Sequence, residues 1–268
     1  MKEIDEKFQP DFVDIVDDLF FINIHKCREI MRGMIKLKMR FRWGANCRAN
    51  IAARFDDDDL RLIKDSGCTK VFVGAESASM KLLKNMNKAI TPEQITTAVE
   101  NFHRYGITTT INFICGFPDE KFSDVQESIT YVKAIMDRLG DRVKFGGINL
   151  YAPYPGSELY EKAIREGHVP PKTFAAWGKF VLNGKTVLPW MDKAYLEKLW
   201  RVAVVSRWAE PSITLQDLSV ALRQNKFERL VAFLIARVFW KRWEKQWYSF
   251  PLDIRLWNWA LNNIAKVG

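Results

Sequence analysis

The sequence predicts an α/β fold, a partial (β/α) barrel of parallel strands followed by a helical C-terminal domain. Runs rich in β-branched and aromatic residues recur, and their ends fall about 30 to 40 residues apart, the spacing of repeated βα units. An amphipathic segment with helix start and stop signals lies between successive runs. After the fifth run the pattern changes to proline-punctuated short helices and then longer helical segments.

Five strand-like runs define the predicted sheet. A closed eight-stranded barrel needs about 250 residues, whereas these units occupy only about 150, so the barrel must be partial or the sheet open. Residues 1–11 read as the end of a helix that leads into the first run, with no strand before it. The five runs are residues 12–18, 40–46, 69–75, 107–115 and 143–151.

The helices between the runs have recognisable ends. A side-chain oxygen able to accept from free backbone N–H groups precedes each amphipathic segment, and glycine follows two of them. The predicted starts are Asn23, Asp56, the capping boxes Thr91/Gln94 and Ser123/Gln126, and Asp192, and the predicted ends are Gly67, Gly106 and Trp208.

Composition excludes several classes of protein. The 268 residues, 48% of them apolar and 27% charged, suffice for one core plus an appendage. No apolar run approaches the roughly 20 residues that cross a bilayer, and the first residues lack the apolar centre of a signal peptide, so we expect a cytoplasmic location. Four scattered cysteines and three isolated histidines match no metal site or histidine-based triad. We therefore expect no metal ligands in this chain and assign no catalytic residue.

Basic and aromatic residues concentrate in the C-terminal part. From Leu196 onward there are 12 basic and 6 acidic residues and seven of the ten tryptophans. Packing of these tryptophans inside the domain is the favoured interpretation, and peripheral contact with an anionic membrane or a lipid-like substrate is the alternative. Nucleic acid is not expected, because no binding motif accompanies the charge. In the helix predicted around residues 226–248, one face carries Arg237, Lys241 and Lys245, and another carries Trp240, Trp243 and Trp247.

Polar or glycine-containing clusters follow the strand-like runs. The carboxyl ends of parallel strands meet at one rim, where such folds bind ligands, so we expect these clusters to lie on one rim. In chain order they are Asp17 with Asp18, Asn46 with Arg48, Glu76 with Ser77, the stretch from Asn112 through Ile114 to Gly116, and Tyr151.

In this order the clusters resemble strands two to six of a radical S-adenosylmethionine (SAM) enzyme, most closely the branch with an N-terminal cobalamin-binding domain. The resemblance covers residues 1–160 and implies a radical SAM core whose first strand is missing. Residues 161–190 are then a linker with short helices, and residues 191–268 a helical C-terminal domain.

The resemblance implies that the rim binds SAM. Asp17 and Asp18 occupy the position of a Gly-Gly-Glu motif that contacts the SAM amino group. Glu76 and Ser77 match the fourth-strand motif near the ribose and amino acid part, which a carboxylate and a hydroxyl can hydrogen-bond. The complete implied set is Asp17, Asp18, Asn46, Arg48, Glu76, Ser77, Asn112, Ile114, Gly116 and Tyr151.

The stretch from Asn112 to Asp119 aligns with the fifth-strand motif that supports adenine, and Gly116 would let a flat ligand approach the backbone. Plainer alternatives stay open for single residues. Asp17 could simply end a strand, Glu76 could pair with Arg48, and residues 116–118 could be only a turn.

The family's C-x-x-x-C-x-x-C motif, whose thiolates hold a [4Fe-4S] cluster, is absent from the sequence. Residues 1–11 resemble the helix that follows this motif, so we expect the first strand, cluster loop and cobalamin domain to lie upstream or in a separate polypeptide. SAM is then the cofactor of this chain, and the cluster and cobalamin come only with that segment. Cys47 and Cys115, near strand ends, are expected to be core or wall thiols.

The sequence therefore predicts the C-terminal part of a radical SAM enzyme, a methyltransferase or a cyclase/oxidoreductase, acting on a small-molecule or lipid-like substrate. We expect it to be inactive without the cluster-binding segment. The alternative is a non-catalytic SAM- or nucleotide-binding or assembly module. A phosphate-binding βα-barrel enzyme is less favoured, because no glycine-rich phosphate loop precedes a helix.

Overall fold

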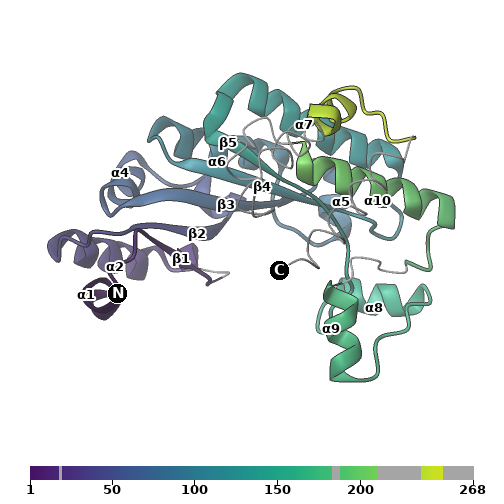
Figure 1. Cartoon of the computed structure of the whole chain (residues 1–268), viewed down its shortest axis with the longest axis horizontal. Helices are drawn as coiled ribbons and strands as arrows, with labels where there is room; N and C mark the ends of the chain where they lie inside the picture. The colour runs from purple at the N-terminus through teal and green to yellow at the C-terminus, as the bar shows by residue number, and fades with distance from the viewer. Residues whose placement is uncertain (18–19, 183–187, 210–236, 250–268) are drawn as a thin grey trace, which may run out of the picture. The chain divides into compact units, whose positions relative to one another are not determined.

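The computed structural model describes residues 1–17, 20–182, 188–209 and 237–249 (Figure 1). The chain forms two compact units, which are described separately below. The first unit contains Met1–Phe113 and Lys121–Phe145, and the second contains Ile114–Glu120 and Gly146–Gly268. The predicted domain boundaries at residues 160 and 190 remain a prediction.

A five-stranded sheet runs in chain order, β1-β2-β3-β4-β5 (Figure 1). The pairs β1–β2, β2–β3 and β3–β4 are parallel, which confirms the predicted α/β class. The first strand is shorter than predicted: it ends at Ile15, whereas the prediction extended it to Asp18. The strands are β1 Phe12–Ile15, β2 Arg42–Arg48, β3 Cys68–Glu76, β4 Thr108–Cys115 and β5 Val143–Leu150.

The predicted helix starts at Asn23, Asp56 and Thr91 are confirmed. Asn23 accepts from the Lys26 amide at 3.2 Å, and Asp56 accepts from the Asp59 amide at 2.8 Å. The Thr91 and Gln94 side chains each accept from the other residue's amide, as the capping box requires. The helices of the first unit are α1 Lys2–Phe8, α2 Ile24–Lys36, α3 Ala49–Ala52, α4 Asp57–Asp65, α5 Met80–Asn85, α6 Pro92–Arg104 and α7 Phe122–Leu139, with 3-10 turns at Phe20–Ile22 and Gly140–Arg142.

The predicted capping box of Ser123 and Gln126 is wrong. Helix α7 begins at Phe122, so Ser123 already lies in its first turn. The Asp124 carboxylate accepts from the Lys121 amide at 2.8 Å, and an ionised acceptor satisfies a helix N-terminus better than a hydroxyl. The short helices α3 and α5 were not predicted, because four or six residues are too few to show helical periodicity.

Aromatic side chains form much of the core of the first unit. Trp43 is fully buried, and its indole N–H donates to the Ser66 carbonyl at 3.0 Å. The rings of Phe21 and Phe55 lie 5.5 Å apart, and those of Phe55 and Phe102 lie 6.1 Å apart. Phe21 lies in the 3-10 turn before α2, Phe55 in the loop before α4 and Phe102 on α6, so these rings connect helical elements of the first unit.

The described residues of the second unit beyond β5 are mainly helical. The predicted helix start at Asp192 is confirmed, since its side chain accepts from the Tyr195 amide at 2.8 Å. Trp243 is 1% exposed whereas Trp247 is 48% exposed, so of these two tryptophans Trp243 is the core residue. In the described part of the chain, no helix is long and apolar enough to cross a membrane. The helices are α8 Glu158–Arg165, α9 Phe174–Leu182, α10 Lys193–Trp208 and the helical residues 237–244, and residues 226–236 of the predicted basic helix lie outside the described residues.

Strand β1 lies at the end of the strand order and exposes apolar side chains. Phe12 on β1 is 40% exposed, and Val16, which directly follows the strand, is 84% exposed. Because an edge strand presents backbone groups that can pair with another chain, we expect the protein to self-associate through this edge. The double substitution Phe12→Lys and Val16→Lys should shift the population toward monomer in size-exclusion chromatography with light scattering.

The matched control is Phe174→Lys, because Phe174 is 95% exposed but lies on α9. This control should leave the association unchanged. A wild-type protein that stays monomeric at every concentration tested would contradict the prediction.

Candidate functional site

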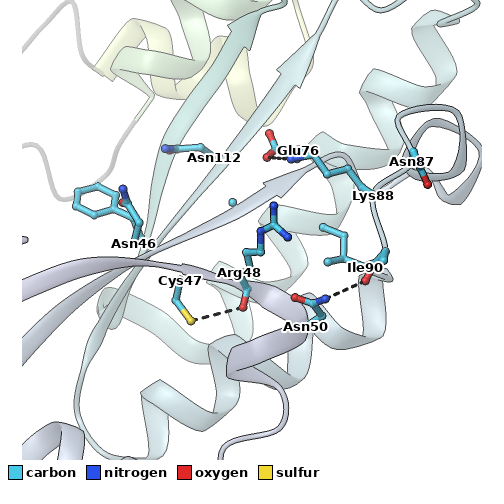
Figure 2. A pocket seen from close by; sticks show the side chains of 12 residues that line it. Asn46, Cys47, Arg48, Asn50, Glu76, Asn87, Lys88, Ile90 and Asn112 are labelled. Atoms are coloured by element: carbon cyan, nitrogen blue, oxygen red, sulfur yellow. Dashed lines mark hydrogen bonds and ion pairs between the residues drawn. The ribbon is translucent and has the colours of Figure 1, made fainter. Parts of the chain in front are cut away.

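A cavity of about 510 Å³ lies in the first unit, toward the carboxyl ends of β2, β3 and β4. Its volume is in the range of small-molecule sites. Figure 2 shows side chains from the strands and from the loop after α5 arranged around this space. The strands contribute Asn46, Cys47, Arg48, Phe72, Gly74, Glu76 and Asn112, and the remaining lining residues are Asn50 and the loop residues 87–90.

Four residues of the predicted site line this cavity: Asn46, Arg48, Glu76 and Asn112. The parallel register brings them together, because Arg48 pairs with Gly74 and Gly74 pairs with Asn112. The other predicted residues are not among those that line it. Asp17 and Ser77 belong to the first unit without lining the cavity, Asp18 is outside the described residues, and Ile114, Gly116 and Tyr151 belong to the second unit.

Glu76 has an unusual backbone conformation. Its φ angle is +60°, in the left-handed region that non-glycine residues rarely adopt. The pairing of β3 with β4 shifts register between Gly74 and Glu76, so one extra residue stands on β3. The Glu76 carboxylate accepts from Lys88 Nζ at 2.9 Å, so its partner is Lys88 rather than Arg48 (Figure 2). Strain of this kind is concentrated at functional sites.

The end of α5 places Lys88 beside the cavity. Asn87 follows the helix with a φ of +52°, a conformation that asparagine tolerates better than most residues. The Asn87 amide donates to the Lys84 carbonyl at 3.0 Å, and the Lys88 amide donates to the Leu83 carbonyl at 2.9 Å. These are the two hydrogen bonds of a Schellman motif, which fixes the backbone on which Lys88 stands.

The loop is also held from its other side. Asn50 Nδ2 donates to the Ala89 carbonyl at 3.2 Å, which links the loop to α3 (Figure 2). The sequence analysis missed Asn50 and Lys88. An asparagine at the end of a short lysine- and leucine-rich segment was the signal available for Lys88, since it is typical of a helix C-terminus. For Asn50 no signal was available, because its partner is 39 residues away.

The cavity combines an aromatic face, amides and opposite charges. Phe72 supplies the ring, against which Lys70 Nζ lies 4.2 Å from the centroid. The Asn112 Oδ1 atom is buried without a hydrogen-bond partner among the described residues, so it can accept from a ligand. Arg48 and Lys88 provide two cations against the single carboxylate of Glu76. The set can stack a flat ring, accept from hydroxyls and bind a carboxylate or phosphate.

Ser77 points into the protein rather than into the cavity. It is 1% exposed, and its hydroxyl accepts from the Ser79 amide at 3.0 Å. The hydroxyl of Ser128 lies 3.4 Å from it and accepts from the Ala78 amide at 2.9 Å. Ser77 therefore holds the turn between β3 and α5, directly after Glu76.

Asp124 completes this turn. Its carboxylate accepts from Ser79 Oγ at 2.9 Å, from the Lys121 amide at 2.8 Å and from Lys81 Nζ at 3.3 Å. Burial by itself raises the pKa of Asp124, but the hydrogen bonds from Lys121, Ser79 and Lys81 outweigh it and leave the pKa below its ordinary value. The charged form of Asp124 is thus stabilised in the folded protein.

Gly116, in the second unit, has a structural reason to be glycine. Its φ is +96°, and an added Cβ would lie 2.7 Å from Leu188 Cδ1. Its amide donates to Glu120 Oε1 at 2.9 Å, and its carbonyl accepts from Trp190 Nε1 at 3.1 Å. The space beside Gly116 that the sequence analysis assigned to a flat ligand is occupied by Leu188. The Tyr151 amide donates to the Cys115 carbonyl at 2.7 Å, within the same unit.

The four cysteines do not fit an iron–sulfur cluster. Burial raises the pKa of Cys68 to about 12, and burial with the nearby Asp17 carboxylate raises that of Cys27 to about 11. Burial also raises the pKa of Cys47 and Cys115, which are 4% and 1% exposed and were expected to be core or wall thiols. Cluster ligands are thiolates, and no group of three metal-binding side chains occurs among the residues described.

A model of the radical SAM superfamily matches residues 11–132. An uncharacterized methyltransferase of Pyrococcus horikoshii is 27% identical over 207 residues, which are 77% of this chain and 42% of that protein. The chain thus spans less than half the length of this curated relative.

Two solved structures share the fold. The cobalamin-dependent SAM radical enzyme OxsB, with aqua-cobalamin and SAM bound, matches with a TM-score of 0.52 at 14% identity over 87% of this chain and 39% of its own. The radical SAM methyltransferase TsrM of Kitasatospora setae, with cobalamin and a [4Fe-4S] cluster bound, matches with a TM-score of 0.50 at 20% identity over 61% of this chain and 32% of its own.

The Asp124 contacts predict a pH-dependent effect of substitution. Asp124→Asn should lower the free energy of unfolding by about 1–3 kcal/mol at pH 7, because charge-assisted hydrogen bonds are lost. A carboxylate whose folded pKa is lowered stabilises the fold above its unfolded pKa of about 3.9 and loses this effect as the pH falls through the folded value. The difference from wild type should therefore shrink below about pH 4 in urea unfolding curves.

Asp137→Asn on the exposed face of the same helix is the control and should change stability little at any pH. An Asp124→Asn deficit that stays constant from pH 7 to pH 3 would contradict the assignment.

Proposed function

We propose that this chain, whose residues 11–132 match the radical SAM superfamily model, binds SAM in the cavity of Asn46, Arg48, Glu76 and Asn112. We propose further that it is the C-terminal part of a radical SAM enzyme of the methyltransferase or cyclase/oxidoreductase type. The whole enzyme would then act on a small-molecule or lipid-like substrate. The chain's similarity to a methyltransferase supports the first of these reaction types.

The observation that carries the proposal is the geometry of Glu76. A left-handed residue at a register shift turns its carboxylate toward the cavity, where a hydroxyl-bearing ligand can donate to it. The two hydroxyls of the SAM ribose suit this acceptor. The family resemblance likewise places Glu76 near the ribose and amino acid part of SAM, which supports the proposal.

The rest of the cavity suits the remaining parts of SAM. Phe72 would stack against the adenine ring, and Arg48 would bind the carboxylate of the methionine part. The buried Asn112 Oδ1 would accept from an N–H donor of the ligand. Asn46 lies beside Phe72 in the strand register and can hydrogen-bond the edge of the stacked ring.

SAM supplies the reactive carbon centre in the chemistry of this family. The residues of this chain bind it, orient it and exclude water from it. Because the four cysteines do not fit a cluster, we propose that the [4Fe-4S] cluster and cobalamin come with an upstream segment or a separate polypeptide. The similarity to OxsB and TsrM, whose structures contain cobalamin, supports this assignment.

A second candidate function follows from the same cysteines. If no cluster-binding polypeptide joins the chain, the cavity serves a non-catalytic module that binds SAM or a nucleotide.

For either function we propose a cytoplasmic protein that does not bind nucleic acid. Peripheral membrane contact through the basic C-terminal domain is proposed from Trp247 and the neighbouring exposed Arg237 and Lys241.

The proposed site predicts the effect of two substitutions on ligand binding. The chain should bind S-adenosylhomocysteine in titration calorimetry, and Arg48→Met and Glu76→Gln should each weaken binding about tenfold or more, because each removes one charge-assisted contact. Arg54→Met and Glu127→Gln, two exposed positions away from the cavity, are the matched controls. Equal binding by all five proteins would refute the site.

The thiols predict the result of cluster reconstitution. Incubated anaerobically with iron and sulfide, this chain alone should not retain a stoichiometric [4Fe-4S] cluster, because no three metal-binding side chains come together among the described residues, which include all four cysteines. Iron and sulfide analysis after gel filtration measures this. A stable visible absorbance that Cys47→Ala or Cys115→Ala abolishes would show the opposite.

A further inference from the structure

The ion pair between Lys88 and Glu76 has a role beyond the contacts of SAM itself. We infer that Lys88 is a positioning residue, which holds the Glu76 carboxylate where it receives the ribose hydroxyls and keeps it away from Arg48. This inference rests on the proposed function, because it assumes that the cavity binds an adenosine-containing ligand. It adds a residue that neither the sequence motifs nor the family resemblance assigns to the site.

The charges of the cavity explain why Glu76 must be held. Glu76 and Arg48 stand on neighbouring strands, and Arg48 pairs in register with Gly74, two residues before Glu76. Figure 2 shows both side chains directed toward the same space. If Lys88 were absent, Arg48 would be the remaining cation among the residues that line the cavity. If Glu76 paired with Arg48, the Glu76 carboxylate could no longer accept from the ribose hydroxyls. Arg48 could likewise no longer bind the carboxylate of the ligand.

The ion pair between Lys88 and Glu76 is suited to orienting the Glu76 carboxylate rather than to stabilising the fold. The Lys88 side chain is 41% exposed and that of Glu76 is 20% exposed. Pairs as exposed as this contribute little to the free energy of unfolding. Lys88 can therefore be replaced without loss of the fold, so that an effect on ligand recognition can be measured.

Hydrogen bonds hold the backbone on both sides of Lys88. The Schellman motif fixes Lys88 to the end of α5, and the Asn50 side chain fixes the next residue, Ala89. Precise placement of a functional group requires such support, because a long lysine side chain on a mobile loop would not select one orientation of its partner. The placement of Lys88 thus comes from helix capping, and the placement of Glu76 from the register shift in β3.

The test compares adenosine with 2′,3′-dideoxyadenosine, which lacks both ribose hydroxyls, by titration calorimetry. Wild type should prefer adenosine about tenfold or more, the lower end for hydrogen bonds to a charged group. Lys88→Met should reduce this preference to below about threefold, and Lys88→Arg should restore most of it, because the charge returns. Lys84→Met, an exposed lysine on α5, should retain the wild-type preference.

A double variant separates positioning from a direct effect. In a Glu76→Gln background the preference should already be low, and adding Lys88→Met should not lower it further, since Lys88 acts through Glu76. The affinity for S-adenosylhomocysteine should fall in Lys88→Met more than in Lys84→Met, because Arg48 becomes paired.

Three results would overturn the inference. A Lys88→Met protein that keeps the full preference for adenosine shows that Lys88 does not position Glu76. A Lys88→Met protein that loses affinity for both nucleosides equally, with a lowered midpoint of thermal unfolding, shows a structural role instead. A wild-type protein without any preference for adenosine would refute the proposed SAM site itself, and with it the role of Lys88.

Discussion

The parallel pairing of β2, β3 and β4 is the constraint on which the cavity depends. Side chains alternate between the two faces of a strand, so a shift of one residue would carry each polar group to the opposite face. The register of Arg48 with Gly74 and of Gly74 with Asn112 places these side chains around one space. The single extra residue before Glu76 then changes the direction of that carboxylate without moving the rest of β3.

The elements around β3 keep this local deviation in place. The turn that follows Glu76 is held by hydroxyls and by the Asp124 carboxylate, all of them buried. Helix α5 begins at that turn and ends at the capping motif that presents Lys88. A short helix of little stability of its own thus links two sides of the cavity, because both of its ends are tied by hydrogen bonds. The residues that shape the cavity thus lie largely at the ends of strands and helices.

The proposed function separates cofactor recognition from cluster chemistry. Its cavity offers an aromatic face, amides and paired charges, which suit a nucleoside with an amino acid part. Its cysteines are buried thiols whose raised pKa values disfavour the thiolate. Among proteins sharing the fold, the OxsB structure contains cobalamin and SAM, and the TsrM structure contains cobalamin and a [4Fe-4S] cluster; this chain matches 39% and 32% of these longer chains. The proposed function therefore assigns SAM recognition to this chain and radical initiation to a further segment.

The sequence by itself determined most of the elements and four of the twelve residues that line the cavity. Strand-like runs, local caps such as Asn23 and Thr91, and the strand-end residues Asn46, Arg48, Glu76 and Asn112 were readable, because alternation, capping and strand ends depend on neighbours a few residues away. Tertiary structure alone decided the left-handed φ of Glu76, its pairing with Lys88, the burial of Ser77 and the contact of Leu188 with Gly116. The physical reason is separation along the chain: these partners lie 12 to 72 residues apart or depend on a register shift, and no local pattern encodes such contacts.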